Sequence, residues 1–66
     1  MNLYAFRKGQ SHYRANYRMH NGNVINLRIV NLENEKEIGL SFLFSEEEQK
    51  KFFRVLKIHS LKWGGC

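Results

Sequence analysis

The chain is poor in the residues and segments that mark several classes of protein. It has no proline, and its single cysteine is the last residue, Cys66, so neither a disulfide framework nor a cysteine-based metal site can form within one chain. No apolar run approaches the roughly 20 residues of a membrane span, and the first residues lack the apolar region of a signal peptide. These absences predict a cytoplasmic protein with no membrane partner.

Sequence signatures of catalysis are also missing. There is no phosphate-cradling glycine loop with a lysine, no nucleophile elbow and no nucleophile–base spacing. The histidines His12, His20 and His59 have no cysteine or paired carboxylates nearby, which argues against a metal site. We therefore expect a non-enzymatic protein with no cofactor.

What is present is a basic and apolar-rich chain. Eleven Lys and Arg face six acidic residues, for a formal charge of +5, and 42% of the 66 residues are hydrophobic. A chain of this length buries only about 60% of the surface that its unfolded form exposes, so little is left to scaffold a catalytic cleft. The composition is too apolar for a disordered basic tail. We expect a single domain, 1–66, that binds a partner.

Apolar residues recur at every second position from Tyr4 to Phe44, which is the period of strands with one buried face. This pattern predicts a sheet over 3–44 with four strands, Leu3–Arg7, His12–Met19, Val24–Asn31 and Ile38–Phe44. Short connections between them favour an antiparallel meander. The side chains expected on the buried face are Tyr4, Phe6, Tyr13, Ala15, Tyr17, Met19, Ile25, Leu27, Ile29, Ile38, Leu40, Phe42 and Phe44.

The turns test this arrangement, because directly opposite residues of an antiparallel pair share a face. A two-residue Gly9-Gln10 loop pairs Phe6 with Tyr13, both buried, and glycine suits the first position of a type II′ turn. A turn at Asn34-Glu35 pairs Ile29 with Leu40 in the same way.

The second hairpin offers two registers. A two-residue Asn21-Gly22 loop would place Arg18 opposite Ile25 and so mix basic and apolar side chains on one face. A three-residue loop over 20–22, with Gly22 as a left-handed bulge, instead pairs Tyr17 with Ile25. The three-residue loop is the register that the pattern favours.

A helix over 45–60 should follow, with a short tail over 61–66. Ser45 and Glu48 form a capping box, and the acidic residues 46–48 lie at the positive end of the helix dipole, which explains them without catalysis. The helix should cover the sheet with Phe52, Val55, Leu56, His59 and Trp63, and Phe53 lies at the edge of this arc. Ile58 and Leu61 fall off the arc, so either the helix breaks near His59 or they contact a partner. The predicted fold class is α+β, a four-stranded antiparallel meander with one C-terminal helix (ββββα).

The uncovered sheet face is the candidate binding surface. Arginine forks make bidentate contacts with phosphates, and asparagine side chains hydrogen-bond bases or backbone. The same residues could equally form a solvated face of a basic protein. The candidate nucleic-acid-binding residues are Arg7, His12, Arg14, Asn16, Arg18, Asn26 and Arg28.

Residues 21–53, NGNVINLRIVNLENEKEIGLSFLFSEEEQKKFF, resemble a type I-F anti-CRISPR family that is built as a four-stranded antiparallel sheet followed by helix. The resemblance implies a phage protein that occupies a Cascade-type ribonucleoprotein and blocks pairing with target DNA. Where that family has an acidic contact this chain has Val30, and only Tyr4 or Phe6 matches the family's first-strand aromatic. The shared positions are Asn21, Gly22, Ile25, Arg28, Asn31, Asn34, Lys36, Gly39, Ser45, Glu47 and Phe53.

A second resemblance is to single-stranded DNA-binding proteins of the positive-cofactor-four type, which also have a four-stranded sheet followed by a helix and usually form homodimers. The strand-to-helix junction over 44–48, an apolar residue, a cap and acidic residues, carries this resemblance. The aromatic that the family places early in the helix corresponds to Gln49 here.

Two functional hypotheses follow. The first is an anti-CRISPR-like inhibitor in the host cytoplasm, a monomer or homodimer that covers a nucleic-acid-binding surface of a host defence protein or ribonucleoprotein complex. Its contacts would be hot-spot aromatics and arginines. The second is a basic protein that binds single- or double-stranded DNA through its exposed sheet face. The partner contacts expected for the inhibitor are Tyr4, Phe6, Arg14, Arg18 and Arg28.

Overall fold

The computed structural model describes residues 2–62, and the predictions for Trp63 and Cys66 lie outside these residues. The chain forms an open antiparallel sheet of four strands in the order β1-β2-β3-β4, followed by a short and a long helix. The predicted α+β class and meander order are therefore confirmed. The elements are β1 Asn2–Lys8, β2 Ser11–His20, β3 Asn23–Asn31, β4 Glu37–Ile38, α1 Leu40–Leu43 and α2 Glu46–Lys62.

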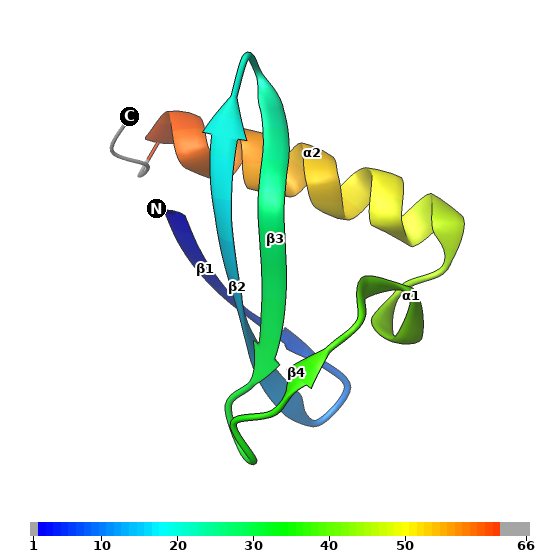
Figure 1. Ribbon diagram of the computed structural model, residues 1–66. Helices are drawn as coiled ribbons and strands as arrows, with labels where there is room; N and C mark the ends of the chain where they lie inside the picture. The colour runs from blue at the N-terminus through cyan, green and yellow to red at the C-terminus, as the bar shows by residue number, and fades with distance from the viewer. Residues whose placement is uncertain (1, 63–66) are drawn as a thin grey trace.

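Helix α2 crosses one face of the sheet and leaves the other face open (Figure 1). The core lies between them, as the alternating pattern predicts. The buried side chains are Tyr13, Ala15 and Tyr17 of β2, Ile29 of β3, and Phe52 and Leu56 of α2. Half-buried residues complete this layer: Tyr4, Phe6, Met19, Val24, Leu27, Ile38, Leu40, Leu43 and Phe44.

The first hairpin has the predicted register. Phe6 lies opposite Tyr13 across a two-residue Gly9-Gln10 turn, and their rings stack with centroids 5.4 Å apart. Gly9 has φ +64° while Gln10 has negative φ, as the first and second central residues of a type II′ turn do.

The second hairpin corrects the predicted register. Asn21 and Gly22 form a two-residue turn with φ +51° and +77°, the pattern of a type I′ turn, and His20 pairs with Asn23 in β2 and β3. Arg18 does lie opposite Ile25, but the register shifts by one residue between Asn16 and Arg18. Asn26, with φ +53°, is the extra residue of this β-bulge.

The bulge exchanges the faces of two neighbouring residues. Val24, predicted to point outward, packs against the core, whereas Ile25, predicted to be buried, is 38% exposed on the outer side. Beyond the bulge Leu27 and Ile29 return to the predicted buried face. The apolar pattern is therefore satisfied by a local irregularity in the strand and not by a longer loop.

The fourth strand is much shorter than the predicted Ile38–Phe44. It contains only Glu37–Ile38, and Ile29 pairs with Ile38 instead of Leu40. Asparagine side chains hold the preceding loop, because Asn31 Oδ1 accepts from Glu33 N at 2.8 Å and Asn34 Oδ1 from Lys36 N at 2.9 Å.

After Gly39 the chain turns into α1 and leaves the sheet edge. Leu40, Leu43 and Phe44 have helical i, i+3, i+4 spacing, and all three pack against the core. Phe42, predicted to lie inward, is 84% exposed, and Leu43, predicted to lie outward, is half-buried. The apolar residues of 40–44 therefore fit both the two-residue period of a strand and the 3.6-residue period of a helix, and the protein adopts the helix.

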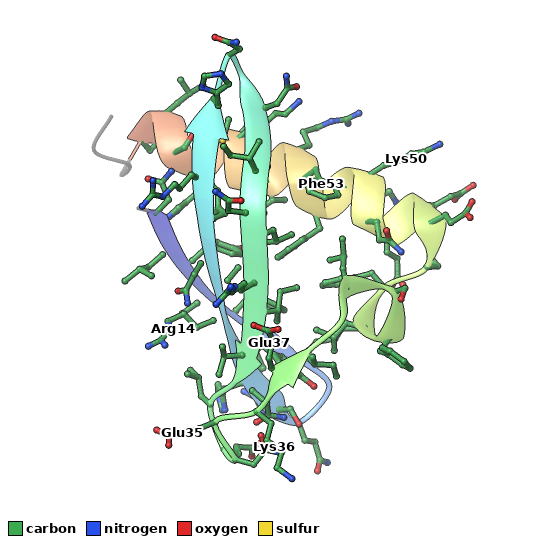
Figure 2. The ribbon with its side chains drawn as sticks, in the orientation of Figure 1. Arg14, Glu35, Lys36, Glu37, Lys50 and Phe53 are labelled. Carbon is green, nitrogen blue, oxygen red and sulfur yellow. The ribbon has the colours of Figure 1, made fainter. Side chains whose placement is uncertain are left out.

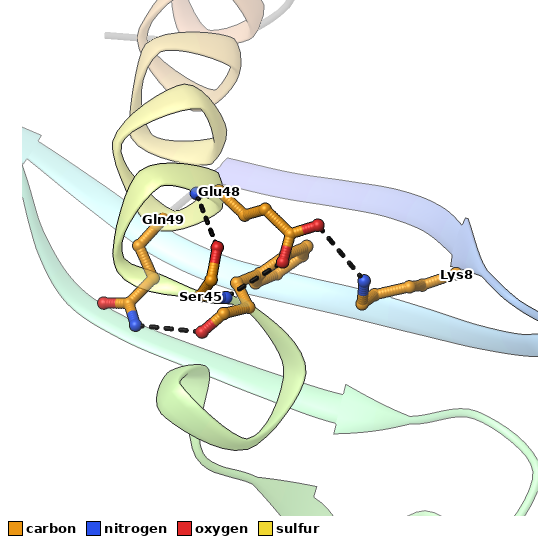
Figure 3. Close-up of polar contacts among 5 residues, drawn as sticks. Lys8, Ser45, Glu48 and Gln49 are labelled. Carbon is orange, nitrogen blue, oxygen red and sulfur yellow. Dashed lines mark hydrogen bonds and ion pairs between the residues drawn. The ribbon is translucent and has the colours of Figure 1, made fainter.

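The predicted capping box begins α2 (Figure 3). Glu48 N donates to Ser45 Oγ at 3.3 Å, while Ser45 N donates to Glu48 Oε1 at 2.9 Å. The other carboxylate oxygen of Glu48 lies 3.7 Å from Lys8 Nζ of β1. The Ser45 amide, and then the Lys8 ammonium, hold the pKa of Glu48 below its ordinary value of 4.5.

Helix α2 covers the sheet with a narrower arc than predicted. Phe52 and Leu56 are buried and Phe53 and His59 are half-buried, but Val55 is 40% exposed. The helix continues through Lys62, so the predicted end at residue 60 and a break near His59 are both wrong. The basic side chains on the other side of the helix are exposed: Lys50, Lys51, Arg54 and Lys57.

Candidate functional site on the outer sheet face

The candidate site is the face of the sheet opposite α2, which we call the outer sheet face. Its members alternate with the core residues of β1, β2 and β3, so the strand period places them there directly, except for Ile25, which the β-bulge turns outward. Arg14 of this face points away from the sheet (Figure 2). The outer sheet face consists of Leu3, Ala5, Arg7, His12, Arg14, Asn16, Arg18, Ile25, Arg28 and Val30.

Strand pairing places the arginines close together. Arg14 and Arg18 are four residues apart on β2, which is about 13 Å of strand. Arg28 of β3 lies opposite Asn16, the residue midway between them, and Arg7 lies opposite His12 at one end of the face. All four arginines are exposed. A single elongated anion can therefore contact several of them at once.

The three long strands contain no acidic residue, because the first carboxylate of the chain is Glu33. An acidic neighbour of the outer sheet face is Glu37 of β4, which lies opposite Val30 and 3.9 Å from Arg28 Nε. Both of these side chains are more than half exposed, and exposed pairs contribute only about 0–1 kcal/mol. Within residues 2–62, Arg7, Arg14 and Arg18 form no ion pair. The outer sheet face thus carries an almost uncompensated positive charge.

The outer sheet face has a depression at the bulge. A surface pocket of about 500 Å³ lies there between β2 and β3. Asn16 Oδ1 is buried beside it, and among the described residues it has no hydrogen-bond partner. The pocket is lined by Asn16, Arg18, Asn26, Leu27 and Arg28.

The structure gathers the predicted nucleic-acid-binding residues on one surface. Arg7, His12, Arg14, Asn16, Arg18 and Arg28 lie on the outer sheet face, with Asn26 at its bulge. His20 also lies in β2, opposite Asn23, although the sequence placed it in a loop. The pocket was not expected from the sequence. The only signal for it in the sequence was the Asn21-Gly22 dipeptide. A two-residue turn there keeps the apolar side chains on one face only if a β-bulge follows in the strand.

The two aromatic residues predicted as partner contacts lie on the other side of the sheet. Tyr4 and Phe6 are half-buried under α2, with ring centroids 6.2 and 5.0 Å from that of Phe52. Tyr4 also meets His59 edge-on at 5.0 Å. The structure therefore brings Arg14, Arg18 and Arg28 together but separates them from Tyr4 and Phe6.

Exposed apolar residues also occur outside the outer sheet face. Ile58 and Leu61 of α2 are 49% and 86% exposed. A groove of about 310 Å³ lies between β3, β4 and α2, lined by apolar side chains such as Ile29, Ile38 and Phe53, with Arg28 and Glu37 at its side. No helix within residues 2–62 has the length and hydrophobicity needed to cross a membrane.

Comparison of the chain with protein-family models, curated proteins and solved structures found no match. The functional reading therefore depends on the geometry and charge of the outer sheet face.

Proposed function

We propose that this protein is a non-enzymatic nucleic-acid-binding protein that contacts phosphate groups through its outer sheet face. The observation that supports this most directly is the grouping of Arg7, Arg14, Arg18 and Arg28 on strands that contain no carboxylate. Arginine makes bidentate hydrogen bonds to phosphate oxygens, and each neutralised phosphate releases counterions.

The arrangement of the aromatic rings favours backbone contacts over base stacking. Proteins that bind single strands without sequence preference commonly stack bases on exposed rings. Here the rings of β1 and β2 lie under α2, while the outer sheet face presents aliphatic side chains such as Leu3 and Ile25 between its arginines. Binding should therefore depend steeply on salt and weakly on base identity.

The test is fluorescence anisotropy with labelled 20-nucleotide single strands and a 20-base-pair duplex between 50 and 200 mM salt. The logarithm of the affinity should fall linearly with the logarithm of the salt concentration. Substituting Arg14, Arg18 and Arg28 together by Ala should reduce this slope by about 2–3, since each lost phosphate contact reduces it by roughly one.

The matched control is the triple Ala variant of Lys50, Lys51 and Lys57, which removes the same charge from the exposed side of α2. It should leave the slope nearly unchanged. Equal losses in the two triple variants would show that only net charge matters. Binding that does not respond to salt would refute the proposal.

A second candidate function is the anti-CRISPR-like inhibitor, acting in the host cytoplasm on a defence protein or ribonucleoprotein. The observation in its favour is the fold, because a four-stranded antiparallel sheet followed by a helix is what the resemblance over 21–53 implies. Its contacts would be Arg14, Arg18 and Arg28 with aliphatic neighbours such as Ile25, since Tyr4 and Phe6 are half-buried. Tight capture of a purified type I-F complex, with no salt-dependent binding of free nucleic acid, would favour this function.

A further inference from the structure

Strand β3 has an edge that β4 covers only in part. β4 pairs with Ile29 and Val30, and beside the segment Asn23–Arg28 no strand of the described residues lies on that side (Figure 1). The backbone groups of a strand alternate between its two neighbours. Because Ile29 directs its groups toward β4, Leu27 directs its own toward the same side. No backbone hydrogen bond within residues 2–62 joins Leu27 to the chain after Ile38, so this edge can pair with a further strand.

The apolar groove of about 310 Å³ lies beside this uncovered edge. Figure 2 shows Phe53 on α2 and Glu37 on β4, above and below the opening. A strand added at the edge would place every second side chain on the helix side of the sheet, against the groove. Those side chains should therefore be apolar. The half-buried apolar residues that line the groove are Leu27, Ile38, Leu40 and Phe53.

The protein's own β4 shows which side chains suit this edge. Ile38 lies opposite Ile29 on the helix side, while Glu37 Oε1 lies 3.9 Å from Arg28 Nε on the outer side. On an added strand that continues the line of β4, the first outward residue lies diagonally across from Arg28, as Glu37 does. The strands beside it contain no carboxylate, so an acidic side chain is favoured there. A second copy of this chain would instead bring two Arg28 side chains together, which repel each other.

We propose that the β3 edge binds an extended segment of a partner protein in which acidic residues alternate with apolar ones. The segment adds antiparallel to β3, in line with β4, and its acidic side chains face the arginines of the outer sheet face. Its apolar side chains enter the groove against Leu27 and Phe53. The protein is then a peptide-binding module as well, and this activity does not rest on the proposed binding of nucleic acid.

Peptide probes test the pairing without changing the protein. Labelled Val-Glu-Val-Glu-Val-Glu-Val should bind saturably in anisotropy titrations at low salt, and the same peptide with Lys in place of Glu should not. Directly opposite residues of an antiparallel pair share a face, and Leu27 faces α2 with its backbone groups toward the edge. The valines opposite this face therefore donate their N–H groups to β3, while the glutamate N–H groups point away from it.

N-methylation distinguishes these two sets of N–H groups. Methylating the two central valines should weaken binding roughly ten-fold or more, because each methyl group removes a donor to β3. The matched control is the peptide with two N-methylated glutamates, whose affinity should stay within roughly two-fold of the unmethylated one. Equal losses from both methylation patterns would overturn the proposed strand pairing.

The variant Phe53→Ala tests the groove. It should weaken binding of the Val-Glu peptide roughly five-fold, because it removes apolar surface that the peptide covers. The control is Ile58→Ala, since Ile58 is 49% exposed on α2 and lies about 140° around the helix from Phe53. It should leave the affinity unchanged. The peptide comparisons need no variant, so they decide the proposal if Phe53→Ala does not fold.

The remaining outcomes separate this proposal from the proposed function. No saturable binding of the Val-Glu peptide, or equal binding of the Lys peptide, would overturn the peptide assignment, and salt-dependent binding of nucleic acid would still stand. A protein that sediments as a dimer and binds no peptide would assign the β3 edge to a second copy. Peptide binding without any binding of nucleic acid would overturn the proposed function alone.

Discussion

Tyr17 is the residue that joins the two layers of the molecule. Its ring is fully buried at the centre of the core, and its hydroxyl donates to the carbonyl oxygen of Leu56 in α2 at 2.7 Å. This bond fixes the height of the helix above β2, because both partners belong to regular elements. Burial, and then the nearby Tyr4, raise the pKa of Tyr17 above its ordinary value of 10.0.

We predict that Tyr17→Phe lowers the free energy of unfolding by about 1–2 kcal/mol, since it removes a buried hydrogen bond while keeping the ring. Urea unfolding at pH 7 measures this loss. Tyr13→Phe is the control, because Tyr13 is also buried but no hydrogen bond of its hydroxyl is found among residues 2–62. A loss of equal size in both variants would contradict the assigned role of the Leu56 bond.

The raised pKa adds a pH dependence to this residue. A tyrosine whose pKa is higher in the folded state stabilises the fold fully below the unfolded-state value, near 10, and loses that contribution as the pH rises toward the folded-state value. The wild-type protein should therefore lose stability above pH 10 more steeply than Tyr17→Phe does. Melting temperatures between pH 8 and pH 11 measure the difference, and parallel curves for the two proteins would refute it.

At the scale of elements, the regular parts of the fold could be predicted from the sequence and the irregular parts could not. Two-residue periodicity is sufficient to place β1 and β2, and the Ser45–Glu48 box is sufficient to start α2. The bulge at Asn26 could not be predicted, because a one-residue shift in pairing and a longer turn both restore the apolar face. The stretch 38–44 fits strand and helix periods alike, so only tertiary packing decides between them.

In the candidate site too, the regular part could be predicted from the sequence and the irregular part could not. Strand alternation is enough to place Arg7, Arg14, Arg18 and Arg28 on one face. The pocket between Arg18 and Arg28 exists only because of the bulge, and so it required the structure.

The bulge leads to a prediction about Asn26, whose φ of +53° lies in the left-handed region. Asn26→Val should destabilise the protein by about 1–2 kcal/mol, because a β-branched side chain is strained there, whereas Asn26→Gly should change stability by less than about 1 kcal/mol. Chemical denaturation measures both. Asn23→Val is the control, since Asn23 is an exposed residue of β3 with negative φ. Tolerance of valine at residue 26 would mean that the bulge does not form.

At the scale of the whole molecule, acidic and basic side chains lie in different segments of the chain. Residues up to Leu32 carry no carboxylate, all six glutamates lie between Glu33 and Glu48, and the rest of α2 is basic. The negative charge therefore lies at the start of α2 and in and next to the loop before β4. Among the described residues, Glu37 is the glutamate that pairs with an arginine of the outer sheet face.

This distribution predicts that Glu37→Gln strengthens binding of nucleic acid. Removing the carboxylate beside Arg28 should increase the affinity roughly two- to three-fold at 50 mM salt and less at 200 mM, where screening is stronger. Anisotropy titrations measure the change. Glu47→Gln is the control, because it alters net charge equally at an exposed position in the first turn of α2. Equal gains in both variants would assign the effect to net charge alone.

The contact between His59 and β1 affects how copies of this chain meet one another. His59 Nε2 lies 2.9 Å from the carbonyl oxygen of Leu3, a residue of the edge strand β1. An edge strand normally presents unpaired groups to which a second sheet can add. Here the last turns of α2 already occupy one of those groups, and at the opposite edge β4 ends after two residues. A second chain that added a strand along β1 at Leu3 would therefore have to displace His59, and with it the last turns of α2, from this edge.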